Sequence, residues 1–198
     1  MKYVVFDLGG VLVDWNPRHL FRKLMPAAEM ERFLGEVATP EWNAKMDAGK
    51  PFADAIAERA VDFPDDGPWL RAYFERWPEM LGGPIEGTVT LLETLDARGV
   101  PLYALTNWSA ETFHHAERRF SFLQRFQDIL VSGREGLVKP HPEVYLALLR
   151  RNRLRPEHGV FIDDVAANVE GARQVGLDGI RFEGPARLRG DLNRRGLL

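Results

Sequence analysis

Residues 2–10 read KYVVFDLGG, an apolar run that stops at an aspartate and is followed by a pair of glycines. After Lys2 the run consists only of aromatic and β-branched side chains, with no polar residue between them. A short continuous apolar run of this kind is typical of a strand in a parallel sheet that is buried on both faces. The stretch therefore predicts a strand over 2–6 that ends at Asp7.

Four later runs repeat this pattern, and they cover 100–105, 128–131, 159–162 and, more weakly, 179–182. Stretches with helical spacing of apolar residues separate the runs, and they cover 88–98, 109–120, 142–152 and 166–175. Gly99 and Gly176 are expected to end two of these helices, and Ser109 to cap another. The alternation of strand and helix predicts an α/β fold with a Rossmann-like parallel sheet and helices on both faces.

Residues 15–85 break this alternation. They contain eight of the 13 prolines and four of the five tryptophans, in several short helical patterns without a convincing strand. We expect them to form a small helical module inserted between the first strand and the rest of the sheet. The 198 residues then divide into an α/β core of residues 1–14 and 86–198 and an insertion of residues 15–85.

Composition limits the classes of protein and of chemistry. The chain is 45% hydrophobic and 28% charged, and its net charge of −3 gives no general attraction to nucleic acid or to an anionic membrane. It has no apolar run long enough for a membrane span and no signal-peptide pattern at the N-terminus. Cysteine is absent, which excludes disulfides, thiolate zinc sites and cysteine nucleophiles. We expect a cytoplasmic monomer or homodimer that binds a small molecule, and neither nucleic acid nor a membrane.

Polar residues follow the predicted strands at one edge of the sheet, and they are Asp7, Thr106-Asn107, Lys139 and Asp163-Asp164. Ligands of open parallel sheets bind at this edge, at the carboxyl ends of the strands. Carboxylate oxygens suit Mg²⁺, and a lysine with a threonine hydroxyl suits phosphoryl oxygens. One aspartate then remains as a covalent nucleophile of the aspartyl-phosphate type.

Each of these residues alone has an ordinary structural explanation. Asp7 can cap a strand, Thr106 can cap the following helix, and Lys139 can be solvated. Asp163 and Asp164 are the sharper signal, because two carboxylates at the end of an apolar strand are costly without a cation. A phosphoreceiver domain has a similar set of residues, but in it the acidic pair precedes the single aspartate, the reverse of the order in this chain.

The motifs together resemble those of the haloacid dehalogenase-like (HAD) hydrolase superfamily, in the same order and over nearly the whole chain. The matching stretches are 6–12, 105–107, 139–140, 161–164 and 167–172. The helical insertion then resembles the cap of that family, and the Asp-Leu-Gly opening resembles its small sugar-phosphate phosphatases related to an α-glucose-1-phosphate phosphatase. The resemblance implies a Mg²⁺-dependent phosphatase of a small phosphorylated metabolite, such as a sugar phosphate.

The resemblance also implies roles at the reacting centre. Asp7 is the nucleophile and a Mg²⁺ ligand. Thr106, with the Asn107 amide, binds the transferring phosphoryl group, and Lys139 neutralises the phosphate and the nucleophile.

The remaining implied roles concern the metal and the walls of the site. Asp164 is the main acidic ligand, and Asp163 binds the ion directly or through water. The carbonyl of Gly9 completes the metal shell, and Gly9 and Gly10 border the phosphate. Asn168 supports the acidic loop.

Gly9 is a departure from the family, because most of its phosphatases have a second aspartate there as general acid and base. A positioned proton donor is typically worth roughly 10²–10⁴ in rate. The protein is then a phosphatase that is slow or uses Asp14, His141 or water instead. Alternatively it is a metal-independent 2-haloacid dehalogenase, against which the intact Asp163-Asp164 pair argues, or a weakly active or non-catalytic binding or regulatory protein.

The insertion is expected to select the substrate from its inner face. Trp15, just beyond the first motif, is a candidate contact for the leaving group. Polar groups are expected from one helix of the insertion, at Glu41, Trp42, Asn43 and Asp47. The other aromatic residues of the insertion are expected to serve packing.

Overall fold

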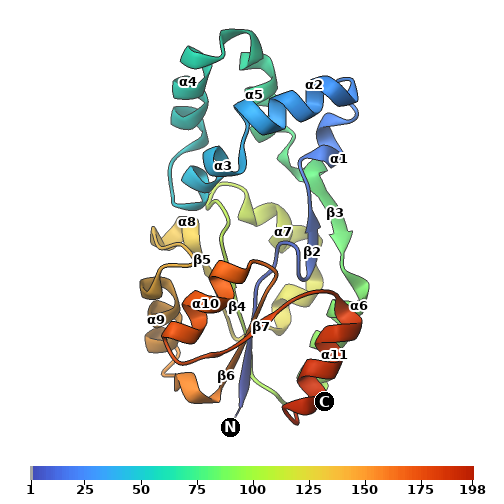
Figure 1. Cartoon of the computed structure of the whole chain (residues 1–198), viewed down its shortest axis with the longest axis vertical. Helices are drawn as coiled ribbons and strands as arrows, with labels where there is room; N and C mark the ends of the chain where they lie inside the picture. Colours follow the sequence, from blue (N-terminus) through green and yellow to red (C-terminus); the bar gives the residue numbers. More distant parts are fainter. Residues whose placement is uncertain (1) are drawn as a thin grey trace.

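The computed structural model describes residues 2–198 and shows a five-stranded sheet between helices, with a helical insert at one end (Figure 1). The strands of this sheet are β1 (Tyr3–Phe6), β4 (Leu102–Thr106), β5 (Asp128–Val131), β6 (Gly159–Asp163) and β7 (Asp178–Arg181). All pairs are parallel, in the order β5-β4-β1-β6-β7. Central β1 pairs Val5 with Tyr103 on one side and with Phe161 on the other. The predicted α/β fold with a Rossmann-like sheet is confirmed.

The two faces of the sheet carry separate apolar cores, because successive side chains of a strand point to opposite faces. Val4 and Phe6 of β1 lie in one core, with side chains of α6 (Glu86–Ala97), α7 (Phe113–Arg119) and α11 (Pro185–Arg194). Tyr3 and Val5 lie in the other core, with side chains of α9 (Pro142–Arg151) and α10 (Ala166–Gln174). The uninterrupted apolar run of β1 therefore reflects burial on both sides.

The helices of the core start and end near the predicted positions, with one exception. Gly99 and Gly176 have φ angles of 72° and 93°, a left-handed backbone that glycine adopts at little cost, and each follows a helix. The helix expected from residue 109 begins only at Phe113. The hydroxyl of Ser109 accepts a hydrogen bond from the Glu111 N–H at 3.2 Å, so this serine stabilises a turn rather than the helix start.

The insert occupies residues 16–80 and consists of short helices around an aromatic centre. Its α-helices are α1 (Arg18–Phe21), α2 (Ala27–Arg32), α3 (Pro40–Asp47), α4 (Phe52–Asp62) and α5 (Gly67–Glu75), and a π-helical turn covers Phe33–Val37. Trp42 and Tyr73 meet edge to face with ring centroids 5.2 Å apart, and Phe52 lies against both. Helices this short need such packing to persist in water. Within residues 2–198, no helix is both long and apolar enough to cross a membrane.

The expectation that residues 15–85 contain no strand is wrong. Leu81–Pro84 form β3, which pairs antiparallel with β2 (Val13–Trp15). Glycine and proline dominate β3 and have low strand propensity, so the strand exists because of its distant partner and not because of its own residues. This two-stranded ribbon connects the sheet to the insert (Figure 1). The small α8 (Ser132–Glu135) follows β5 on the side that faces the insert.

Candidate active site

Asp7 follows β1 directly. The chain rises from the N-terminus through β1 toward the end of the sheet that faces the insert (Figure 1). Its backbone N–H donates to the carbonyl of Ile162 in β6 at 2.8 Å, which fixes the chain at this point. Its Oδ1 accepts from the Leu8 N–H at 2.7 Å and lies 2.9 Å from Lys139 Nζ. No donor from residues 2–198 contacts Oδ2. One carboxylate oxygen is therefore held in place, and the other is available to a ligand.

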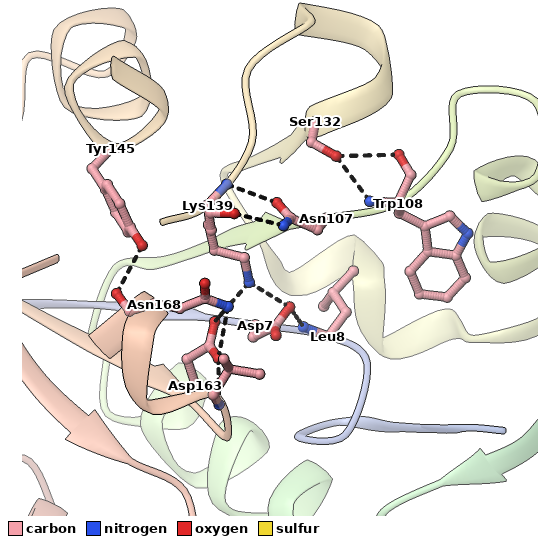
Figure 2. A network of polar contacts seen from close by, with 10 residues as sticks. Asp7, Leu8, Asn107, Trp108, Ser132, Lys139, Tyr145, Asp163 and Asn168 are labelled. Carbon is pink, nitrogen blue, oxygen red and sulfur yellow. Dashed lines mark hydrogen bonds and ion pairs between the residues drawn. The ribbon is translucent and has the colours of Figure 1, made fainter. Parts of the chain in front are cut away.

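Lys139 joins two carboxylates below the cavity. Its ammonium group lies 2.9 Å from Asp7 Oδ1 and 2.7 Å from Asp163 Oδ2, and its side chain is 1% exposed (Figure 2). Burial alone would lower the pKa of Lys139, but the two carboxylates outweigh it and hold this pKa above its ordinary value. The lysine is therefore charged and positioned without help from a ligand.

The side chain of Asn107 positions Lys139 from the neighbouring strand. Its Nδ2 donates to the Lys139 carbonyl at 3.0 Å, and its Oδ1 accepts from the Lys139 N–H at 2.9 Å (Figure 2). This pair of bonds uses both polar atoms of the side chain. The second N–H of Nδ2 and the main chain of Asn107 remain for a contact with a phosphoryl group.

Asp163 is fully buried and supports the site from behind. Its oxygens accept bonds from Lys139 Nζ, from the Val165 N–H at 2.8 Å and from Asn168 Nδ2 at 3.1 Å. Asn168 is held in turn by the hydroxyl of Tyr145, which donates to its carbonyl at 2.7 Å. Asp163 is thus braced by protein donors on both oxygens, and its direct contact with a metal stays a prediction.

Three carboxylates converge at this point. Oxygens of Asp7, Asp163 and Asp164 lie within 4.8 Å of one another, with one lysine to balance them. Burial raises the pKa of Asp7 to about 8, against the lowering effect of Lys139, and the neighbouring carboxylates raise it further. Burial and Asp163 also raise the pKa of Asp164. A divalent cation would relieve this excess of negative charge, and oxygen ligands of this type fit Mg²⁺.

A cavity of about 280 Å³ lies above these groups. Its walls include every predicted site residue except Asp163, namely Asp7, Gly9, Gly10, Trp15, Thr106, Asn107, Lys139, Asp164 and Asn168, with Val165 in addition. Gly10 has a φ of 75°, and a Cβ at this position would lie 2.6 Å from Asp164 Oδ2. Glycine is therefore required there for both backbone conformation and space. The structure brings together residues from four separate motifs, as the sequence predicted.

Gly9 borders open space, since a Cβ built on it meets no atom within 4 Å. Two candidates for the missing acid, Asp14 and His141, do not line this cavity. Within residues 2–198 they also do not line the two neighbouring cavities described below. Asp14 instead bonds to His19 Nε2 at 2.8 Å on the connecting ribbon. His141 precedes the first turn of α9. Neither side chain therefore borders the space in which a leaving group can lie, and water remains of the three proton sources considered.

A smaller cavity of about 60 Å³ adjoins Gly9 and was only partly foreseen. Its walls include the aromatic rings of Phe52, Trp77 and Trp108, which sequence reasoning assigned to packing or did not single out. The signal available for Trp108 was its place directly after Asn107. Trp42, expected to present a polar group, instead donates from Nε1 to Ala55 O within the insert at 3.3 Å, because its ring fills the aromatic centre.

The loop between α3 and α4 rests on the core beside this cavity. Ser132 Oγ donates to the Asp47 carbonyl at 2.5 Å. It accepts from the Trp108 N–H at 2.9 Å (Figure 2). Glu111 Oε2 accepts from the Phe52 N–H at the start of α4 at 2.7 Å. These bonds hold the Asp47 side chain at the border between insert and core. Burial raises the pKa of Asp47 to about 7.

A third and much larger cavity extends from the site along the insert. We call it the insert groove, and its volume is about 880 Å³. Residues of the insert and of the ribbon contribute most of its wall, namely residues 15–18, Glu31, Leu34, Gly35, residues 38–40, Asn43, Ala44, Asp47 and Tyr73. Asn107, Val165 and Asn168 form its end at the core. The groove therefore provides a space beside the phosphoryl site that the sequence did not disclose.

Comparison with known proteins gives one family match. The model of the haloacid dehalogenase-like hydrolase family matches residues 1–176. A sesquiterpene phosphatase of Aspergillus oryzae is 29% identical over 184 residues, which cover 91% of this chain and 89% of the relative. A phosphorylated carbohydrates phosphatase of Thermotoga maritima is 27% identical over 190 residues, which cover 91% and 84%.

One solved structure extends the likeness to three dimensions. A HAD family enzyme from Bacteroides thetaiotaomicron, in complex with magnesium and inorganic phosphate, matches with a TM-score of 0.70 and 20% identity. The match covers 93% of this chain and 95% of the other. At this identity the comparison shows a common fold.

Proposed function

This chain belongs to the haloacid dehalogenase-like hydrolase family, and on that premise we propose that it is a Mg²⁺-dependent phosphatase of a small phosphorylated metabolite. One observation carries the proposal: Asp7 has one oxygen held by Lys139 and Leu8, and it lines a cavity bordered by Thr106 and Asp164. The names of both phosphatase relatives support it, as do the magnesium and phosphate in the Bacteroides structure. In this proposal residues 15–85 act as the cap over a core of residues 1–14 and 86–198.

The first step forms a bond between Asp7 Oδ2 and phosphorus and breaks the bond between phosphorus and the leaving oxygen. Lys139 keeps Asp7 oriented through Oδ1, so that Oδ2 faces the cavity. The Thr106 hydroxyl donates a hydrogen bond to a phosphoryl oxygen, and the Lys139 ammonium group balances part of the charge on these oxygens. In the second step water attacks the phosphorus of the aspartyl-phosphate, which releases inorganic phosphate and restores the Asp7 carboxylate.

The proposed metal ligands are Asp7, Asp164 and the carbonyl of Gly9, with Asp163 direct or through water. Bound Mg²⁺ supplies positive charge that reduces the repulsion between these carboxylates and a phosphate dianion. Protein groups alone leave three carboxylates against one lysine at this point. The donor set therefore fits the ion.

The leaving oxygen must gain a proton, and Gly9 cannot supply one. Because Asp14 and His141 do not border the site cavities, we propose water as the source. The reaction is then fastest for esters whose leaving group is stable as an anion. A sugar phosphate linked through its anomeric oxygen is one such ester, and the names of the relatives include both carbohydrate and sesquiterpene substrates.

The proposal is tested by phosphate release from p-nitrophenyl phosphate, with Mg²⁺ and with a chelator, in the native protein and in Asp7→Asn. We expect release that requires the metal and is abolished by the substitution. Release that persists in folded Asp7→Asn would overturn the mechanism. Halide release from a 2-haloacid without metal would favour the dehalogenase instead. Absence of both activities over a broad substrate panel, in folded protein, would favour a non-catalytic role.

A further inference from the structure

The insert groove adjoins the cavity above Asp7. Trp15, Asn107, Val165 and Asn168 line both. A phosphate monoester bound at Asp7 therefore has two directions for its leaving group, the small aromatic cavity and the insert groove. The volume of about 880 Å³ lies within the range of roughly 300–1,000 Å³ that is typical of sites for small organic ligands. Only the groove has room for a substantial leaving group.

The polar side chains at the inner end of the groove already have protein partners. Tyr73 donates its hydroxyl proton to Asn43 Oδ1 at 3.0 Å, and Asn43 Nδ2 donates to Asp47 Oδ2 at 2.9 Å. The side chain of Asn107 is bound to the main chain of Lys139, and that of Asn168 to Asp163. These bonds use much of the hydrogen-bonding capacity of these side chains within the protein.

The charged side chains of the groove also compensate each other. Arg18 donates to both oxygens of Glu31, from Nε at 2.7 Å and from Nη2 at 2.5 Å. Among residues 2–198, the buried side-chain donor in this wall without a partner is Trp15 Nε1. A sugar ring with several hydroxyl groups would lose hydrogen bonds to water here without replacing them, which is unfavourable for each group.

Apart from Asn16 and Thr39, the rest of the wall is apolar. It includes Pro17, Leu34, Ala38 and Ala44, together with Val165 beside the acidic loop. Val165 is 47% exposed, which makes it one of three large aliphatic side chains in residues 2–198 that are prominently exposed. A hydrocarbon substrate that covers these side chains removes apolar surface of the substrate and of the groove wall from water. The resulting gain in binding free energy is proportional to the buried area.

We propose that the insert groove binds the leaving group of the substrate, and that this group is an extended hydrocarbon chain. The substrate class is a monophosphate ester of a long-chain or prenyl-type alcohol rather than of a sugar. This inference rests on the phosphatase activity proposed above, because the phosphoryl end must lie at Asp7.

The test compares kcat/KM, with Mg²⁺, for ethyl, butyl, octyl and decyl phosphate below their micellar concentrations and for glucose 6-phosphate. We expect kcat/KM to rise with chain length by up to about fourfold for each CH₂ that is buried. Octyl phosphate should exceed glucose 6-phosphate by at least about tenfold. A flat or falling series, or a preference for the sugar phosphate, would overturn the inference while hydrolysis of p-nitrophenyl phosphate still supported the phosphatase. Absence of turnover with every ester would overturn both.

Two variants locate the chain within the groove. Ala44→Glu places a charge in the groove wall, and Ala57→Glu makes the same change on an exposed position of α4 outside it. We expect Ala44→Glu to lower the ratio of decyl to ethyl phosphate efficiency by at least about tenfold and Ala57→Glu to leave it unchanged. Gly35→Phe fills the groove from a position where a Cβ meets no atom within 4 Å, and it should lower the same ratio. An unchanged ratio in both groove variants would exclude the groove as the binding site.

Discussion

Two regions of the active site satisfy their polar groups in opposite ways. In the acidic site, formed by Asp7, Lys139, Asp163 and Asp164, the internal bonds leave an excess of negative charge and one free Asp7 oxygen. In the insert groove, the pairs Tyr73–Asn43, Asn43–Asp47 and Arg18–Glu31 leave few free polar groups. The first region can bind ions and a phosphoryl group, whereas the second can bind the apolar part of a ligand. In our proposal the acidic site therefore carries out the reaction, and the insert groove selects the substrate.

The largest expected effect comes from Lys139→Met in the acidic site. The variant leaves Asp7 and Asp163 buried without their cation, and breaking a buried pair in this way typically costs about 3–5 kcal/mol. We expect this loss in urea unfolding, together with loss of turnover for every ester to a similar extent. Lys45→Met, at an exposed position of α3, is the control. A loss that depended on the leaving group would contradict the division between the two regions.

The next effect is a gain of activity at Gly9, which borders the cavity of the acidic site. Because a Cβ fits there without contact, Gly9→Asp should be accommodated and supply the proton donor that the site lacks. We expect kcat for alkyl phosphates to rise about tenfold to hundredfold, with little change for p-nitrophenyl phosphate, whose leaving group needs no proton. Gly9→Asn has nearly the same shape without the acid. An equal gain in both variants would show that the effect is not proton transfer.

The acidic site could be predicted from the sequence because its residues are fixed by local context. Each follows an apolar run that forms a strand, and parallel strands bring their carboxyl ends to one edge of the sheet. Asp7 and Asp164 were therefore placed together although 157 positions separate them along the printed sequence. The bracing role of Asn107 was not predicted, because it depends on how its side chain meets the main chain of Lys139.

The insert groove could not be predicted in the same way. Its wall comes from short helices whose arrangement depends on aromatic packing around Trp42 and Tyr73, and no local pattern encodes that arrangement. The β2–β3 ribbon was missed for a related reason, since β3 consists largely of glycine and proline and depends on a partner far away in the sequence. Where pairing and packing are nonlocal, residue types alone do not reveal the cavity that forms.

Ser132 joins the insert to the core, and its removal should cost less than the loss of Lys139. Ser132→Ala leaves the Asp47 carbonyl and the Trp108 N–H without this partner in a buried place. We expect a loss of about 1–3 kcal/mol of unfolding free energy and a larger change in KM than in kcat, because the α3–α4 loop loosens. Ser121→Ala, at an exposed position, is the control. A fall in kcat alone would assign Ser132 to the acidic site instead.

The smallest effect concerns the pH dependence of stability. It tests whether water is excluded from the Asp47 carboxylate at the inner end of the insert groove. Burial raises the pKa of Asp47 to about 7, although the Ser109 N–H, Lys139 and Asn43 lower it, whereas the ordinary value is 3.8. Between these two values the native state keeps a proton that the unfolded chain releases, so the free energy of unfolding falls as pH rises through this window. Asp47→Asn carries no such proton.

The Tm of Asp47→Asn, relative to that of the native protein, should therefore rise between about pH 5 and pH 8, by roughly 4 °C or more. Asp54→Asn, at an exposed position of α4, should show no such gain. A difference for Asp47→Asn that stayed constant with pH would mean that water reaches the carboxylate. A wet carboxylate at the inner end of the groove would weaken the case for a hydrocarbon ligand and leave the acidic site as the better defined of the two regions.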